Sequence, residues 1–302
     1  MPQSRTPEID RLYQDVASYR SVEKFRKMLK FIRRFRHIAP YNAMLVYTQR
    51  PGSRYVASAR DWQTRFGRTV KPGARPLVIL QPFGPVSFVY EYRDTIGEPL
   101  PKSILSPARV KIKIRRSALD ALVNNLKAEG ICVNFADCST DSIEKIAFCD
   151  DGQVQEMRLP DGICRLKTCH VITVSRQLSV TKKYAAIIHA LGRLYCGHIY
   201  HNHNTEKWLP DRFYSGLTRE QQEFEAETVC WLVCERLGLS NPAVLFPGSD
   251  GEIPDVSIDA ILKAAGTIES IVRSPLRECR KELIVEIIRQ PRYEQCSLFD
   301  GT

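Results

Sequence analysis

The sequence lacks any long apolar run. No segment approaches the roughly twenty consecutive apolar residues that a membrane-spanning helix needs. Residues 1–5 also lack the apolar core that begins a signal peptide. We therefore expect a cytoplasmic protein with no membrane partner. At 302 residues and 43% hydrophobic content, the chain is long enough for about two domains with sizeable cores.

The ten cysteines include no C-x-x-C pair, and several of them lie inside predicted helices or strands, as Cys132, Cys196, Cys230 and Cys234 do. This pattern argues against a zinc ribbon and favours reduced thiols in the core. Acidic residues are also in deficit, because the formal net charge is +10. A basic chain favours acidic partners such as nucleic acid, although an excess of this size is also a common solubility feature.

The helix predicted over residues 186–198 lacks two of the three residues that define a zinc peptidase helix. In the pattern H-E-x-x-H, residues four apart share one helical face, so that both imidazoles reach the metal while the glutamate activates its water. Here His189 keeps the first position, Ala190 replaces the general base and Arg193 replaces the second imidazole. The helix therefore keeps the first ligand of a zinc peptidase motif but lacks its general base and its second imidazole.

A second helix, predicted over residues 219–235, places Glu223 and Glu227 four residues apart on one face. In gluzincin-type peptidases such a pair supplies the third ligand and a supporting acid. Together with His189 and residues 194–198, the segment 223–227 and the apolar run after it resemble the ImmA/IrrE family of metallopeptidase-like proteins. The resemblance implies a zincin-like domain, a zinc cofactor and action on a repressor-type protein, but the zinc motif departs from the family.

The altered motif predicts a remnant site rather than a working one. Two carboxylates beside a vanished cation are costly unless a positive group replaces the metal, and Arg193 is our candidate to bridge Glu223 or Glu227. We assign no catalytic residue with confidence and expect no cofactor. If zinc still binds, His189 and Glu223 are its expected ligands, one short of the usual three. A second candidate metal site consists of histidines that follow the helix, namely His198, His201 and His203, against the simpler interpretation of a solvated loop.

The first predicted helix, within residues 8–37, carries concentrated positive charge. Phe25, Met28, Leu29 and Ile32 recur at helical spacing, while lysines and arginines fill much of the remaining surface. Three interpretations stay open: a surface helix docked by one face, a helix that contacts phosphates, and, less favoured, a helix on a membrane surface.

Residues 39–80 combine aromatic and basic side chains, as stacking on bases and neutralisation of phosphates require. The segments 40–43, 49–52 and 71–75, with the helix around Trp62, resemble the N-terminal domain of ArdC-type antirestriction proteins, which implies binding of single-stranded DNA. Trp62 and Tyr41 also suit a hydrophobic core. The candidate nucleic-acid contacts from both segments are Lys24, Lys27, Lys30, Arg34, Tyr41, Arg50, Trp62, Arg65, Arg68 and Lys71.

We predict an α+β chain in three parts. Residues 1–115 hold the basic helix and the ArdC-like domain, residues 116–290 a zincin-like domain in which a small mixed sheet packs on the former metal helix and the Glu-bearing helix, and residues 291–302 a flexible tail. Within the second part we expect strands over residues 131–135, 153–159 and 170–174, the last at a sheet edge able to hold a peptide, and helices over residues 257–271 and 276–288. The tail resembles peptides that dock on the sliding clamp through Gln295, Leu298 and Phe299, with Cys296 in place of the usual leucine.

Three functions are compatible with these patterns. The first is a catalytically impaired ImmA/IrrE-type protein, a pseudoenzyme that binds nucleic acid and a protein or peptide partner, on a mobile element or in a stress or defence response. The second is an active zinc metallopeptidase that cleaves a repressor-type protein. The third is a DNA-binding or clamp-recruited protein whose C-terminal domain is purely structural.

Overall fold

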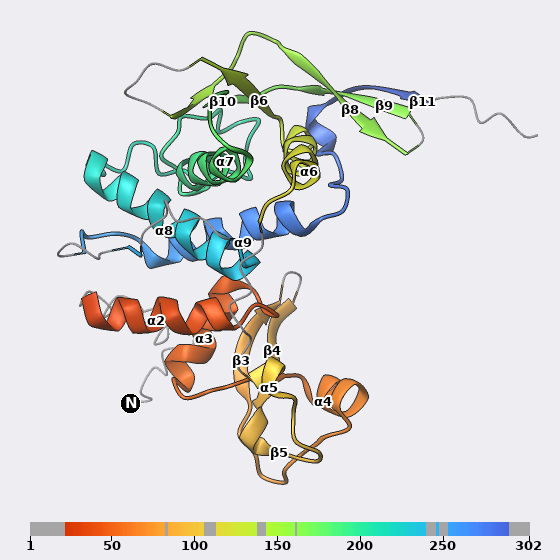
Figure 1. Cartoon of the computed structure of the whole chain (residues 1–302), viewed down its shortest axis with the longest axis vertical. Coiled ribbons are helices and arrows are strands. Elements are labelled where there is room, and N and C mark those ends of the chain that lie inside the picture. Colours follow the sequence, from red (N-terminus) through yellow and green to blue (C-terminus); the bar gives the residue numbers. More distant parts are fainter. Residues whose placement is uncertain are drawn as a thin grey trace, which may run out of the picture.

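The computed structural model describes residues 22–81, 84–105, 113–137, 143–160, 162–239, 246–247 and 253–289. These residues form the mixed α+β fold that the sequence predicts. Figure 1 shows the arrangement as layers, with a sheet above a central helix, two further helices below it, and the N-terminal elements beneath those. No described helix is long and apolar enough to cross a membrane.

The upper sheet contains three strands in the order β6 (Ile131–Ala136), β10 (His170–Ser175) and β7 (Glu144–Phe148). β10 pairs parallel with β6 and antiparallel with β7, so that His170 lies opposite both Ile131 and Phe148. The strand expected at the edge, residues 170–174, is therefore central. This expectation was wrong because β7, a short strand with a mixed polar and apolar sequence, occupies the edge instead.

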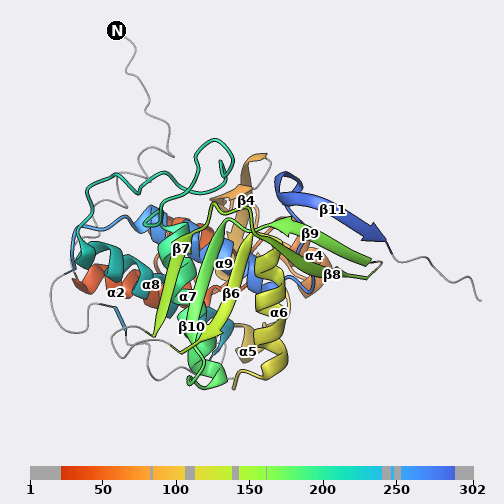
Figure 2. The ribbon, with the colours of Figure 1, turned by 90° about the horizontal axis from the view of Figure 1, so that it is seen from above.

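Three helices lie below this sheet: α7 (Val180–Tyr195), α8 (Arg219–Leu237) and α9 (Ile258–Arg273). Figure 2 shows the strands of the sheet lying across α7. Ile187, Ile188, Leu191 and Leu194 are at most 1% exposed, because α7 is covered on both sides by the sheet and by the other two helices. An apolar sequence around most of the helix circumference is what such a position requires.

A second antiparallel sheet has the order β11 (Ile284–Arg289), β9 (Gly162–Lys167) and β8 (Val154–Leu159), with helix α6 (Arg116–Lys127) near it (Figure 1). The sequence placed β8 in the same sheet as β10 and predicted a helix over residues 276–288. Both expectations were wrong. Residues 284–288 are rich in β-branched side chains, which favour a strand once a partner such as β9 is available.

The N-terminal elements begin with the predicted basic helix, α2 (Val22–Arg34), and continue with α3 (Pro40–Gln49). A small sheet follows, with the order β1 (Val56–Ala57), β4 (Gly84–Glu91) and β3 (Leu77–Gln81), beside α4 (Ala59–Phe66). The short strands β2 (Thr69–Val70) and β5 (Thr95–Ile96) pair with each other, and α5 (Lys102–Leu105) comes after them.

One hydrophobic cluster joins the N-terminal helices to the C-terminal ones. It contains Phe25 and Met44 from α2 and α3 together with Leu232 and Ile268 from α8 and α9. Arg236 of α8 is buried in this region and donates hydrogen bonds to the carbonyl oxygens of residues 32, 35 and 38. The division of the chain at residue 115 stays a prediction, and apolar side chains on both sides of it share this cluster.

Candidate functional site

Helices α7 and α8 position His189 and Glu223, the residues of the predicted remnant site, and local sequence signals define where the two helices begin. Ser179 caps α7 by accepting a hydrogen bond from the backbone of Lys182. Thr218 and Gln221 form a capping box at the start of α8. The two helices approach closely at Gly192, where a Cβ atom would lie 3.1 Å from the carbonyl oxygen of Ala226. This close crossing brings side chains of α7 and α8 within hydrogen-bond distance.

His189 lies between two carboxylates from different elements. Its Nδ1 atom is 2.7 Å from Oε1 of Glu144 in β7, and its Nε2 atom is 3.2 Å from Oε1 of Glu223 in α8. The side chain of Glu144 is 9% exposed and that of His189 is 19% exposed, whereas that of Glu223 is 50% exposed. Both ring nitrogens therefore face acceptors, which is the arrangement of an imidazolium that donates two hydrogen bonds.

The two carboxylates change the protonation of His189. Burial alone would lower its pKa, but hydrogen bonds to Glu144 and Glu223 reverse this effect and raise the pKa to about 9. The same hydrogen bond from His189 lowers the pKa of Glu223. Burial, and then the charge of Glu223, raise the pKa of Glu227. At neutral pH His189 is consequently a cation and has no lone pair free to act as a base.

Arg193 does not form the predicted bridge to Glu223 or Glu227. Within the described parts of the chain its side chain forms no ion pair, and its Nε atom is buried without a hydrogen-bond partner. Its charge still contributes to the lowered pKa of Glu223. The cation in contact with the carboxylates is His189 itself, because Glu144 arrives from a strand that the sequence did not predict.

The residues around His189 do not fit a catalytic zinc ion. Such an ion takes three protein ligands, and His189 with Glu223 supplies two. Arg193, a cation, stands at the position of the third, and Ala190 is fully buried in the hydrophobic cluster. The site therefore lacks both the zinc ligands and the general base that hydrolysis by a zincin requires.

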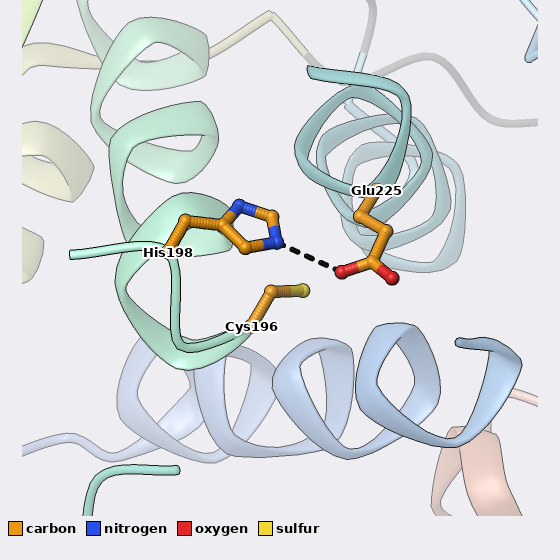
Figure 3. A group of neighbouring side chains, drawn as sticks. All are labelled: Cys196, His198 and Glu225. Atoms are coloured by element: carbon orange, nitrogen blue, oxygen red, sulfur yellow. Dashed lines mark hydrogen bonds and ion pairs between the residues drawn. The ribbon is translucent and has the colours of Figure 1, made fainter. Parts of the chain in front are cut away.

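A buried cluster that the sequence did not predict lies at the end of α7 (Figure 3). Gly197 adopts a left-handed φ of 80° and turns the chain, so that Nε2 of His198 lies 2.8 Å from Oε2 of Glu225. The sulfur of Cys196 joins them, and the three ligand atoms lie within 4.8 Å of one another. The sequence treated His198 as part of a continuing helix, whereas Gly197 was the available signal that the helix ends.

Arg212 holds the carboxylate of this cluster. Its guanidinium donates hydrogen bonds of 2.8 and 2.9 Å to the two oxygens of Glu225 and one of 2.8 Å to the carbonyl oxygen of Cys196. The backbone N–H of Ser257 donates to Glu225 as well, at 2.8 Å. Burial alone would raise the pKa of Glu225, but the hydrogen bonds from His198 and Arg212 lower it to about 2.

The predicted metal site at His198, His201 and His203 does not assemble. In the described residues, the group of Cys196, His198 and Glu225 is the one set of three or more His, Cys, Asp or Glu side chains close enough to share an ion. The rings of His201 and His203 are in contact, with centroids 4.4 Å apart, and His203 lies 3.7 Å from Asp211. His198 pairs with Glu225 instead.

The basic residues of α2 form one exposed face of that helix. Lys24, Lys27, Lys30 and Arg34 are all exposed, and their spacing of three and four residues places them along the same side. Arg34 has a pKa lowered first by burial and then by the charge of Arg54.

Several other candidate nucleic-acid contacts are structural. Trp62, Arg68 and Tyr41 are 0%, 5% and 9% exposed. The indole N–H of Trp62 donates to the carbonyl oxygen of Tyr90, and the Arg68 guanidinium donates to the hydroxyl and carbonyl oxygens of Thr95. The expectation that these side chains stack on bases or contact phosphates is corrected by their burial.

The other candidate nucleic-acid contacts are Arg50, Arg65 and Lys71. Arg50 forms an ion pair with Asp94. Arg65 and Lys71 are exposed, and Nζ of Lys71 donates to the carbonyl oxygen of Arg93. The proposed clamp-binding residues Gln295, Leu298 and Phe299 lie outside the described residues.

No protein-family model and no curated protein matches the sequence. Among solved structures, the fold is similar to the Mn(II)-bound crystal structure of the antirestriction protein ArdC from plasmid R388. The two share 15% sequence identity and a TM-score of 0.36, over 82% of this chain and 95% of that one. Values this low carry no conclusion about the fold or the activity of this chain, so the chain's own geometry has to support any proposal about its function.

Proposed function

We propose that this chain is a non-catalytic binding protein, a zincin-like scaffold that contacts nucleic acid and holds a peptide. The observation that carries the proposal is the imidazolium of His189 between Glu144 and Glu223, at 2.7 and 3.2 Å. A protonated ring occupies the position of a metal ion and satisfies the carboxylates that a metal would otherwise neutralise. The domain keeps its architecture without the parts that hydrolysis needs.

The nucleic-acid contact is the exposed face of α2, formed by Lys24, Lys27, Lys30 and Arg34. The buried face of the helix fixes its orientation, because Phe25, Met28, Leu29 and Ile32 are at most 1% exposed. Cations held along a rigid helix suit the repeating negative charge of a phosphate backbone and release its counterions on binding. A protein that is basic only for solubility would not need to gather its cations on one face of a helix, as α2 does.

Neutralising this face tests the proposal. We expect the variant Lys24→Gln, Lys27→Gln, Lys30→Gln, Arg34→Gln to bind a labelled single-stranded oligonucleotide more weakly. We also expect the slope of log K against log salt to flatten by about 0.7 for each phosphate that the variant no longer neutralises. Fluorescence anisotropy over a salt series measures both quantities, and a duplex of the same sequence shows which form is preferred.

The matched control carries the same change of charge elsewhere. Lys182, Lys207, Arg158 and Arg60 are exposed cations outside α2, and their replacement by glutamine should leave the slope unchanged. If both variants lose affinity equally, net charge rather than the α2 face attracts the nucleic acid. If the wild-type protein binds neither oligonucleotide, the proposed contact is excluded.

The peptide contact is the outer edge of β7. Among the described residues this strand pairs with β10 alone, and its residue Glu144 belongs to the site at His189. An extended peptide added to this edge would pass the exposed carboxylates of Glu223 and Glu227, so we propose a partner with basic side chains.

A panel of extended peptides tests this contact. Lysine-containing peptides should bind more tightly than their glutamate-containing counterparts, and the double variant Glu223→Gln, Glu227→Gln should remove the difference. Glu220→Gln, on the exposed start of the same helix, is the control. Equal binding of both peptide classes by the wild-type protein would exclude an acidic groove.

A further inference from the structure

We propose that Cys196, His198 and Glu225 form a structural zinc site, separate from the remnant site at His189. Their ligand atoms, a thiol sulfur, an imidazole nitrogen and a carboxylate oxygen, lie within 4.8 Å of one another and converge in Figure 3. In a tetrahedral zinc site neighbouring ligand atoms are roughly 3.5 Å apart. Small side-chain movements would therefore bring the three atoms within coordination distance of one ion.

The donor set selects zinc over harder cations. A thiolate with an imidazole and one carboxylate suits a borderline-soft ion, whereas magnesium, calcium and manganese prefer oxygen donors. The side chains of His198 and Glu225 are both 0% exposed, and Cys196 is fully buried as well. Three buried protein ligands would hold the ion, and a water molecule would take the fourth position of the tetrahedron.

The fold builds this site at the meeting point of three helices. Cys196 is the C-cap of α7, Glu225 lies in α8, and the Ser257 N–H that contacts Glu225 is the N-cap of α9. Gly197 allows the intervening turn, because a Cβ atom there would lie 2.7 Å from the carbonyl oxygen of Pro210. An ion at this point would fix the end of α7 to both of its neighbours.

The guanidinium of Arg212 lies beside Glu225, where the zinc ion would bind, and Asp259 is a second carboxylate with which it could pair. Oδ1 of Asp259 is buried and has no hydrogen-bond partner, while Oδ2 of the same residue pairs with Lys263. Burial lowers the pKa of Arg212, and this is outweighed by Glu225, with smaller contributions from Cys196 and then Asp259. When zinc binds Oε2 of Glu225, Arg212 releases that oxygen and turns toward Asp259.

The proton balance of binding follows from the ligands. Zinc binds the deprotonated sulfur of Cys196, so the thiol proton passes to solvent as the Zn–S bond forms. Zinc also needs the lone pair on Nε2 of His198, so the ring proton would be carried on Nδ1, a buried atom without a partner. Zinc affinity should therefore rise with pH.

Cobalt substitution of the full-length protein tests the site. The protein is stripped with a chelator and titrated with Co²⁺, and we expect one ion per chain with a tetrahedral visible spectrum and a thiolate-to-cobalt charge-transfer band. Competition with Zn²⁺ should remove both signals. Binding without a thiolate band, or no binding, would overturn the proposal.

Variants locate the ion. Cys196→Ser should abolish the charge-transfer band and weaken zinc binding by more than the roughly 10–100-fold that loss of an outer-sphere partner costs. Cys234→Ser, another buried cysteine, should keep the band and shows that the substitution alone is tolerated. His189→Gln should also keep the band. Loss of the ion in that variant would place the metal at His189 and contradict our assignment.

A milder variant keeps the ligands and tests the role of Asp259. Asp259→Asn removes the second position for Arg212, and we expect zinc to bind roughly tenfold more weakly with an unchanged cobalt spectrum. Unchanged affinity would show that Arg212 does not move to Asp259. Because nucleic-acid binding depends on α2, none of these results bears on that contact, and the two proposals can fail separately.

Discussion

At the residue scale, one histidine determines the electrostatics of the remnant site. His189 is held by Glu144 and Glu223 at 2.7 and 3.2 Å, and its charge compensates both carboxylates. An arginine is the usual residue for such a bidentate role, yet Arg193 forms no ion pair in the described part of the chain. The shorter imidazole of His189 can contact both carboxylates because one approaches it from β7 and the other from α8.

The raised pKa of His189 predicts a specific loss of stability at alkaline pH. The folded-state value is about 9, and the unfolded chain has a value of about 6.5. Folding therefore favours the protonated form, so the contribution is complete below about pH 6.5 and is lost as the pH rises through 9. Comparing urea denaturation of wild type and His189→Gln from pH 6 to 10 should show a difference that shrinks by about 3 kcal/mol.

Glu144→Gln provides the control for this titration. It removes one of the two acceptors that raise the pKa of His189, so the alkaline loss should begin at a lower pH. Direct NMR titration of the His189 ring gives the same answer without unfolding the protein. A ring that titrates near pH 6.5 would contradict the ion-pair arrangement.

At the element scale, the crossing of α7 and α8 depends on a residue without a side chain. A Cβ atom at Gly192 would lie 3.1 Å from the carbonyl oxygen of Ala226 and 3.4 Å from Cβ of Val229. The first neighbour is backbone, which cannot turn away. The helices therefore come close enough for His189 and Glu223 to meet because position 192 is glycine.

Adding a methyl group at this crossing should destabilise the protein. We expect Gly192→Ala to lower the free energy of unfolding by about 1–3 kcal/mol, as overpacking does in a well-packed core. Gly266→Ala in α9 is the matched control, because its Cβ atom would meet only Cδ of Pro40 at 3.6 Å. That change should stabilise the protein by about 0.4–1 kcal/mol through the unfolded chain. If chemical denaturation gave the same change in free energy of unfolding for Gly192→Ala and Gly266→Ala, the close crossing of α7 and α8 would be contradicted.

At the scale of the whole molecule, Arg236 joins the N-terminal helices to the C-terminal part. Its buried guanidinium pairs with Glu269 of α9 and donates to three carbonyl oxygens at the end of α2 and the turn after it. Those carbonyl groups belong to the last turn of α2 and the residues after it, where the regular helical hydrogen bonds end. One side chain thus satisfies backbone groups more than 190 positions away in the sequence.

Removing this side chain should uncouple the two parts. Arg236→Ala leaves the carbonyl groups without this donor and Glu269 with the longer contact to Arg273, at 3.4 Å, and we expect a loss of about 3–5 kcal/mol with faster proteolysis of α2. Arg277→Ala is the control, because its partner Glu129 keeps a second arginine, Arg280, at 2.6 Å. If α2 is cleaved no faster in Arg236→Ala than in the control, the coupling lies elsewhere in the shared core.

The sequence by itself determined α2, α7 and α8 and their faces, although it wrongly predicted a helix over residues 276–288. The spacing of Phe25, Met28, Leu29 and Ile32 is enough to predict α2 and its exposed basic side, because helical periodicity is a local property. The same holds for α7 and α8, and for the absence of a second imidazole and a general base beside His189. These features depend only on which residues follow one another.

Only the tertiary structure decided the partners. Glu144, Arg212 and Arg236 acquire their roles from segments that are distant in the sequence, and no periodicity identifies them. Trp62 had two interpretations until burial excluded stacking on bases, and residues 284–289 became a strand because β9 was available to pair with them. The physical reason is common to all of these cases, because the environment of a side chain depends on contacts that form only when the chain folds.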